Sequence, residues 1–145
     1  MIRIYTSTII DASVQDVWAT IRDFNELPKW HALINRSEIV EGLPSDKIGC
    51  VRTLYLETGQ QVQEQLVSMS DQDHSFSYTM LDAPLGMYNY ISTAKLRPVT
   101  DGNACFMEWT AEFTTKAGEE DEKRDMVANG VFKGGFDGVK ALLKK

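Results

Sequence analysis

Apolar and polar residues alternate along most of the chain, which predicts a mainly β protein with helical segments near its two ends. The segment "IRIYTSTII", residues 2–10, has period two and many β-branched residues, as expected for a strand. The turn sequences "GLPSDKIG", "TG", "DQD", "DAPLG" and "TDGN" separate six further alternating segments. These strands are predicted at about 36–41, 50–57, 60–70, 74–81, 87–97 and 103–114.

Two short helical segments are predicted directly after the first strand. Ser13 is a suitable N-cap, with Asp16 three residues later and Trp18 and Ile21 on one face. The next segment, "NELPKWHALI", predicts a second short helix or turn that breaks near Pro28.

The last segment, from about residue 119 to 144, predicts one long helix. Acidic residues crowd its start and lysines its end, which suits the helix dipole. At about 100° per residue one broad face is apolar; it contains Val127, Ala128, Val131, Phe132, Gly135, Val139, Leu142 and Leu143. Glycine in a helix costs roughly 0.8–1 kcal/mol relative to alanine. The glycines therefore indicate close packing on a sheet or room for a guest, and the spacing 130–134–138 could also seat a partner helix in a homodimer.

This order of elements predicts an α+β fold. Consecutive antiparallel strands cannot bury both faces alone, so the long helix must cover one face of the sheet. We expect a curved seven-stranded antiparallel sheet wrapped around the C-terminal helix, with a space between them.

Bulk composition narrows the class of protein further. The chain has 145 residues, which fits one domain spanning 1–145, and a formal charge of −6, which argues against nucleic-acid binding. Its two cysteines, Cys50 and Cys105, are too few for a disulfide framework and are predicted to be reduced core thiols. No apolar run approaches the length of a membrane span or of a signal peptide, so a cytoplasmic location is the default expectation.

Several segments in this order resemble the START-like (SRPBCC, pollen-allergen-like) superfamily, and most closely its bacterial polyketide cyclase/dehydrase-type proteins. They are "DASVQDVWATIRDFNELPKWH", "GCVRTLYLETG", "QEQLVSM", "FSYTMLDAPLGMYNYIS", "MEWTAEF" and "NGVFKGGFDGVKALL". The resemblance implies the helix-grip fold, with a deep and mostly apolar cavity between the sheet and the last helix. It says little about function, because the superfamily includes cyclases, hormone receptors and lipid carriers.

The plant abscisic-acid receptors of the same superfamily line their ligand site with a lysine, a glutamate, a tyrosine and a serine. The matching positions here are His31, Glu64, Tyr90 and Ser92. The lysine is replaced by histidine, and "ETGQQ" and "DAPLGMY" replace the receptor's gate and latch sequences. The resemblance therefore implies similar cavity polarity but not a hormone receptor of that type.

Glu64 interrupts an apolar strand face that otherwise contains Val62 and Leu66. A three-residue loop, 57–59, would pair Leu54 with Val62 and Arg52 with Glu64, whereas a two-residue turn would break this match. A buried carboxylate without a partner would cost several kcal/mol or take up a proton, and Arg52 offers the compensation. The alternative is a partly exposed pair near the rim of the sheet, worth under about 1 kcal/mol.

The predicted ligand-binding residues lie on the faces that should line the cavity: His31, Arg52, Leu54, Leu56, Val62, Glu64, Tyr88, Tyr90, Ser92, Val131 and Gly135. His31 could serve as an acid or base near neutral pH, or it could simply be packed at a helix end. Tyr88, Tyr90 and Ser92 could orient a polar ligand, or the tyrosines could form a packed ladder. Alternation points Glu108 outward, whereas the receptor pattern would turn it inward.

The sequence has no Ser/His/Asp set, no glycine-rich phosphate loop and no metal-ligand spacing, so catalytic residues stay unknown and no metal or other cofactor is expected. The function predicted first is binding of a small hydrophobic or aromatic molecule with a polar end. The alternative is a polyketide cyclase/dehydrase-like enzyme or isomerase that uses His31, Glu64 or Tyr90 for proton transfer.

Overall fold

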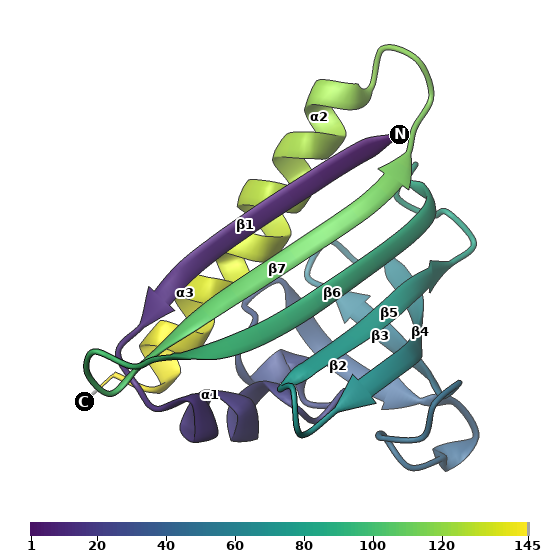
Figure 1. The fold of residues 1–145 in the computed structure, drawn as a ribbon. Helices are drawn as coiled ribbons and strands as arrows, with labels where there is room; N and C mark the ends of the chain where they lie inside the picture. The colour runs from purple at the N-terminus through teal and green to yellow at the C-terminus, as the bar shows by residue number, and fades with distance from the viewer. Residues whose placement is uncertain (145) are drawn as a thin grey trace.

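The computed structural model, which describes residues 1–144, has one antiparallel sheet that curves around a C-terminal helix (Figure 1). The strand order is β1-β7-β6-β5-β4-β3-β2, so the first and last strands pair and every other neighbour is joined by a hairpin or loop. The predicted α+β fold and its seven strands are confirmed. The strands are β1 (Ile2–Ile10), β2 (Ile34–Ile39), β3 (Val51–Leu56), β4 (Gln61–Ser70), β5 (Ser75–Leu81), β6 (Tyr88–Val99) and β7 (Ala104–Thr114).

The two short helical segments after β1 also form. In α1 (Val14–Ile21) the Ser13 hydroxyl accepts a hydrogen bond from the Asp16 amide at 3.1 Å, as the capping pattern predicted. Pro28 lies at the start of a single 3-10 turn, η1 (Leu27–Lys29). A second 3-10 turn, η2 (Val40–Gly42), ends β2 earlier than predicted, because Glu41 adopts a left-handed conformation with φ 63°.

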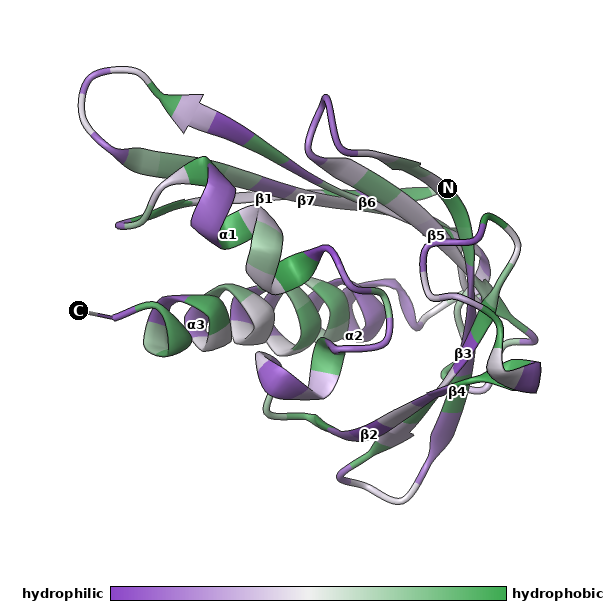
Figure 2. Cartoon of the chain, turned by 90° about the horizontal axis from the view of Figure 1, so that it is seen from below, coloured by the Kyte–Doolittle hydropathy of each residue, from purple (hydrophilic) through white to green (hydrophobic). Residues whose placement is uncertain are grey.

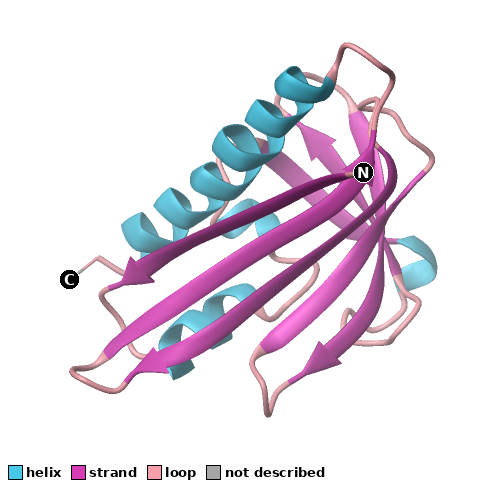
Figure 3. Cartoon of the chain, turned by 45° about the horizontal axis from the view of Figure 1, so that its top comes forward, coloured by secondary structure: helices cyan, strands magenta, loops and turns pink. Residues whose placement is uncertain are grey.

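The C-terminal helix runs without a break from Glu120 to Leu142 (Figure 3). Its centre is wound differently from its ends. The segments are α2 (Glu120–Asp125), a π-helical stretch η3 (Met126–Phe132) and α3 (Lys133–Leu142). In an unbroken α-helix, Val127 and Val139 would point about 120° apart. The wider π turns reduce this offset, and both side chains are fully buried. A pattern analysis that assumed a constant angle could not detect this change.

Two of the three glycines in the helix stripe, Gly134 and Gly138, are covered by the chain itself. A Cβ at Gly138 would overlap the carbonyl oxygen of Trp30, and one at Gly134 would lie 3.2 Å from the His31 ring. The loop that contains η1 therefore packs directly on the helix, and the stripe leaves no open groove there for a partner helix. The homodimer stays a prediction.

Buried apolar residues form one core cluster, and hydrophobic segments of the ribbon occur both on the sheet and on the helix that it curves around (Figure 2). Cys50 and Cys105 are buried free thiols in this region, as predicted. None of the helices within residues 1–144 is both long and apolar enough to cross a membrane.

Candidate functional site

A cavity of about 270 Å³ lies between strands β2 to β7, the loop around η1 and the first half of the C-terminal helix. Most of its lining is apolar and includes Leu27, Leu54, Val62, Met80, Met87, Met126, Val127 and Val131. Its exposed lining residues, here called the rim, are Glu57, Thr58, Gln60 and Asp125. An engineered apolar cavity of about 150 Å³ holds benzene, so this volume suits a molecule of about two rings.

Eight of the eleven residues predicted from the sequence line this cavity: His31, Arg52, Leu54, Leu56, Val62, Glu64, Tyr90 and Val131. Their convergence depends on the β3–β4 hairpin, which has the predicted loop. Leu56 and Gln60 close it through a backbone hydrogen bond of 2.9 Å, and Gly59 adopts a left-handed φ of 91°. In that register Arg52 lies directly opposite Glu64.

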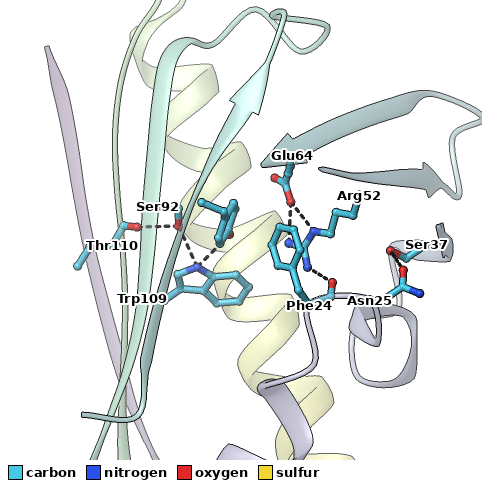
Figure 4. Close-up of polar contacts among 9 residues, drawn as sticks. Phe24, Asn25, Ser37, Arg52, Glu64, Ser92, Trp109 and Thr110 are labelled. Atoms are coloured by element: carbon cyan, nitrogen blue, oxygen red, sulfur yellow. Dashed lines mark hydrogen bonds and ion pairs between the residues drawn. The ribbon is translucent and has the colours of Figure 1, made fainter. Parts of the chain in front are cut away.

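Arg52 and Glu64 form a buried ion pair on the apolar wall (Figure 4). The Glu64 Oε1 atom accepts hydrogen bonds from Arg52 Nε at 3.0 Å and from Nη2 at 2.6 Å. Nη1 donates to the backbone carbonyl of Phe24 at 2.6 Å, and the guanidinium lies 3.8 Å over the Phe24 ring. The side chains are 4% and 8% exposed, so the alternative of a rim-exposed pair is wrong.

The hydrogen bonds of the pair leave one carboxylate oxygen unused. Both Arg52 contacts go to Oε1, and within residues 1–144 no hydrogen bond reaches Glu64 Oε2. Burial raises the pKa of Glu64, and the neighbouring Arg52 guanidinium opposes that rise. Glu64 therefore presents a free acceptor to the cavity, held in place by its other oxygen.

His31 is held in one neutral form by two contacts. Its Nδ1 accepts a hydrogen bond from the Leu33 amide at 3.3 Å, so Nε2 must carry the proton that it donates to the Val131 carbonyl at 2.7 Å. Burial lowers the pKa of His31, which keeps the ring neutral near pH 7. With both nitrogens engaged, His31 ties the loop after η1 to the π-helical stretch and has no free atom for proton transfer.

Two tyrosines contribute hydroxyls on the sheet side of the cavity. Tyr78 and Tyr90 both line it, and burial is the main reason that the pKa of each is raised. The Tyr78 hydroxyl accepts a hydrogen bond from Trp109 Nε1 at 3.2 Å. Both phenols therefore stay protonated at neutral pH and can donate or accept hydrogen bonds.

The structure does not bring three of the predicted residues to the cavity wall. The Ser92 hydroxyl accepts from Trp109 Nε1 at 3.0 Å and donates to the Thr110 carbonyl at 2.8 Å, so it is used within the sheet. Tyr88 is 37% exposed, because the register shifts between Tyr88 and Ile91, where Asn89 has φ 53°. Gly135 packs on Trp109, and a Cβ there would lie 2.5 Å from that ring.

Glu108 points outward, as alternation along the strand predicted. It lies on regular β7 between buried Met107 and Trp109, and its carboxylate is 3.4 Å from Arg97. No register shift interrupts the pairing of β7 with either neighbour near this residue, so nothing turns Glu108 toward the cavity.

Sequence reasoning missed several contributors to the site. The Phe24 carbonyl holds Arg52, but a backbone atom leaves no signal in the residue pattern. Tyr78 lies on β5 with the alternation expected of an inward side chain, but it was not among the predicted ligand-binding residues. Glu57 and Asp125 were assigned to a turn and to the acidic start of a helix, and their common place on the rim became visible only with the fold.

The curved sheet around one long helix is the predicted helix-grip fold. Residues 1–144 match the sequence model of the family described as polyketide cyclase / dehydrase and lipid transport, and the chain belongs to this family. The predicted resemblance is thus confirmed. A search of curated proteins gave no match.

Three solved structures illustrate the similarity. The protein XoxI from Bacillus cereus is 28% identical with a TM-score of 0.87, over 98% of this chain and 95% of that one. A protein from Thermobifida fusca is 25% identical with a TM-score of 0.86, over 97% and 91% of the two chains. Norcoclaurine synthase from Thalictrum flavum, in complex with dopamine and hydroxybenzaldehyde, is 16% identical with a TM-score of 0.76, over 98% and 86%. This last similarity concerns the fold alone.

Proposed function

We propose that this protein binds a small hydrophobic or aromatic molecule with one polar end in the cavity between sheet and helix. The observation that carries the proposal is Glu64 Oε2, a fixed acceptor that has no hydrogen-bond partner among residues 1–144, on a wall that is otherwise mostly apolar. Binding sites for small molecules combine apolar walls with a few oriented polar groups. The norcoclaurine synthase structure, with two small aromatic molecules bound, supports such a use of this fold.

Energetics also support a functional role for the ion pair. A buried ion pair rarely stabilises a fold more than apolar side chains of the same volume would. The β3–β4 wall could be built from leucines alone, so the pair is better explained by recognition of a polar group than by folding.

A matched pair of tryptophan variants tests the proposal. Val131 faces the cavity, whereas Lys140 lies exposed on the outer side of the same helix. A neutral fluorescent probe of two rings, 1-naphthylamine, should bind the parent and the Lys140→Trp variant alike and should bind Val131→Trp at least about tenfold more weakly. Native mass spectrometry of freshly purified protein should show a retained small molecule. Equal probe binding by all three proteins would contradict the proposed site.

A second candidate function is acid–base catalysis of a cyclase/dehydrase type in the same cavity. The observation in its favour is that Glu64 and Tyr90 line one void. His31 is excluded from the chemistry by its two hydrogen bonds. Loss of water from a small aromatic β-hydroxyketone, catalysed by the parent but not by Glu64→Gln, would establish this function.

A further inference from the structure

The charged groups around the cavity are mostly acidic. Its lining contains three carboxylates, on Glu57, Glu64 and Asp125, and one guanidinium, on Arg52. His31 adds no charge near neutral pH, because burial lowers its pKa. A molecule that enters over the rim therefore meets negative potential, which concentrates cations and disfavours anions.

The cations close to the cavity are already balanced by carboxylates. Arg52 donates three of its five N–H groups, two of them to Glu64 and one to the Phe24 carbonyl. Lys123 is buried beside Gly86, and its Nζ lies 3.9 Å from Glu119 and 3.7 Å from Glu122. An anionic ligand would have to compete with these carboxylates for either cation.

The polar groups that are open to a ligand select for hydrogen-bond donors. Tyr78 and Tyr90 have hydroxyls, which can both donate and accept, so they do not discriminate. While its carboxylate is ionised, Glu64 can only accept hydrogen bonds through Oε2. Burial raises the pKa of Glu64, but the Arg52 guanidinium, which donates twice to Oε1, opposes that rise and favours the ionised form. A ligand carboxylate facing it would place two like charges together in a weakly solvated site.

We infer that the ligand is a compact apolar amine, of about the size of two rings, whose protonated nitrogen binds Glu64 Oε2, and that matched carboxylic acids are rejected. This inference rests on the proposed binding function and adds the chemical class of the ligand. A neutral alcohol with the same skeleton can donate one hydrogen bond to Oε2 but brings no charge. Its affinity should lie between those of the amine and the acid.

The test uses three ligands with one skeleton: naphthalenemethylamine, naphthalenemethanol and naphthoic acid. Each displaces the two-ring probe 1-naphthylamine from the parent protein at neutral pH and low salt. The amine should be effective at a concentration at least about tenfold lower than the acid, with the alcohol in between. Because this series uses the parent alone, it does not depend on the folding of any variant.

Two variants locate the source of the preference. Glu64→Gln should remove the advantage of the amine over the alcohol. Asp101→Asn, which removes one carboxylate in the exposed β6–β7 turn, should preserve that advantage. If the acid displaces the probe as well as the amine does, the inference is wrong while the proposed binding function stands. If the parent binds neither the probe nor any of the three ligands, the binding function itself fails.

Discussion

Removing Glu64 alone should destabilise the protein strongly. In Glu64→Leu the Arg52 guanidinium, whose side chain is 4% exposed, loses both contacts to Oε1, at 3.0 and 2.6 Å. Breaking a buried ion pair in this way costs about 3–5 kcal/mol. Each kcal/mol shifts the Tm of a domain near this size by about 2–4 °C. The Tm should therefore fall by roughly 10 °C.

Removing both charges should recover most of the stability that Glu64→Leu loses. Apolar replacement of a buried pair is often neutral or stabilising, by up to about 4 kcal/mol. Arg52 also donates a hydrogen bond to the Phe24 carbonyl at 2.6 Å, and leaving that acceptor unpaired costs about 1–3 kcal/mol. The double variant Arg52→Leu with Glu64→Leu should thus lie within about 2 kcal/mol of the parent and be more stable than Glu64→Leu.

The stability of the single variant Arg52→Leu should depend on pH. Burial already raises the pKa of Glu64, and loss of the guanidinium removes the interaction that opposes this rise. The folded variant then binds a proton that the unfolded chain releases at lower pH, so its stability must fall as the pH rises through the raised pKa. Relative to the parent, Arg52→Leu should be least destabilised in acid and most destabilised at neutral pH.

Denaturant unfolding of the parent, both single variants and the double variant at several pH values checks this reasoning. The four free energies of unfolding give the coupling between the two side chains. A double variant that is as unstable as the sum of the two singles would refute the argument, because the pair would then contribute no coupling of its own. In that case packing alone, without an interaction with Arg52, would account for Glu64 at this position.

Two further predictions concern the helix and the loop packed on it. Gly138→Ala should lower stability by about 1–3 kcal/mol or more, because its Cβ would overlap the Trp30 carbonyl. In the control Gly130→Ala the new Cβ lies more than 4 Å from every described atom outside the backbone of its own helix, so this variant should be neutral or slightly stabilising in thermal unfolding. Equal stability of the two variants would mean that the loop moves freely out of the way of the new Cβ in Gly138→Ala. His31 should make the fold less stable as the pH falls below about 6.5, since the unfolded chain takes up a proton that the folded ring resists. His31→Gln should flatten that part of the stability profile, and parallel profiles for the two proteins would contradict the assignment.

The sheet and the ion pair followed from local rules that act along a single hairpin. Period-two alternation placed Glu64 on an inward face, and a glycine suited to a left-handed turn fixed the register that puts Arg52 opposite it. Both signals lie within fifteen residues of sequence, so no long-range information was needed. The family resemblance then supplied the global arrangement.

The positions that escaped prediction depend on irregular backbone or on distant contacts. Tyr88 was assigned inward by alternation, and the left-handed Asn89 breaks that phase. The π turns change the direction in which helix side chains point, and no particular residue type marks such turns in the sequence. The carbonyl that His31 binds, that of Val131, lies 100 positions away in the chain. Gly135 has the small size expected beside a cavity, but it is small because Trp109 fills the space.

The two halves of the C-terminal helix should differ in how readily they open. In α3, Gly135, Phe136 and Val139 pack on the sheet and the η1 loop, whereas the helix between Asp125 and Val131 lies over the cavity. Segments with less packed surface beneath them open at lower free energy than the rest of the fold. Amide protons of the first half should therefore exchange with solvent while those of the second half stay protected. This opening would give the proposed ligand a path into the cavity through partial unwinding of one helix, without separation of the strands.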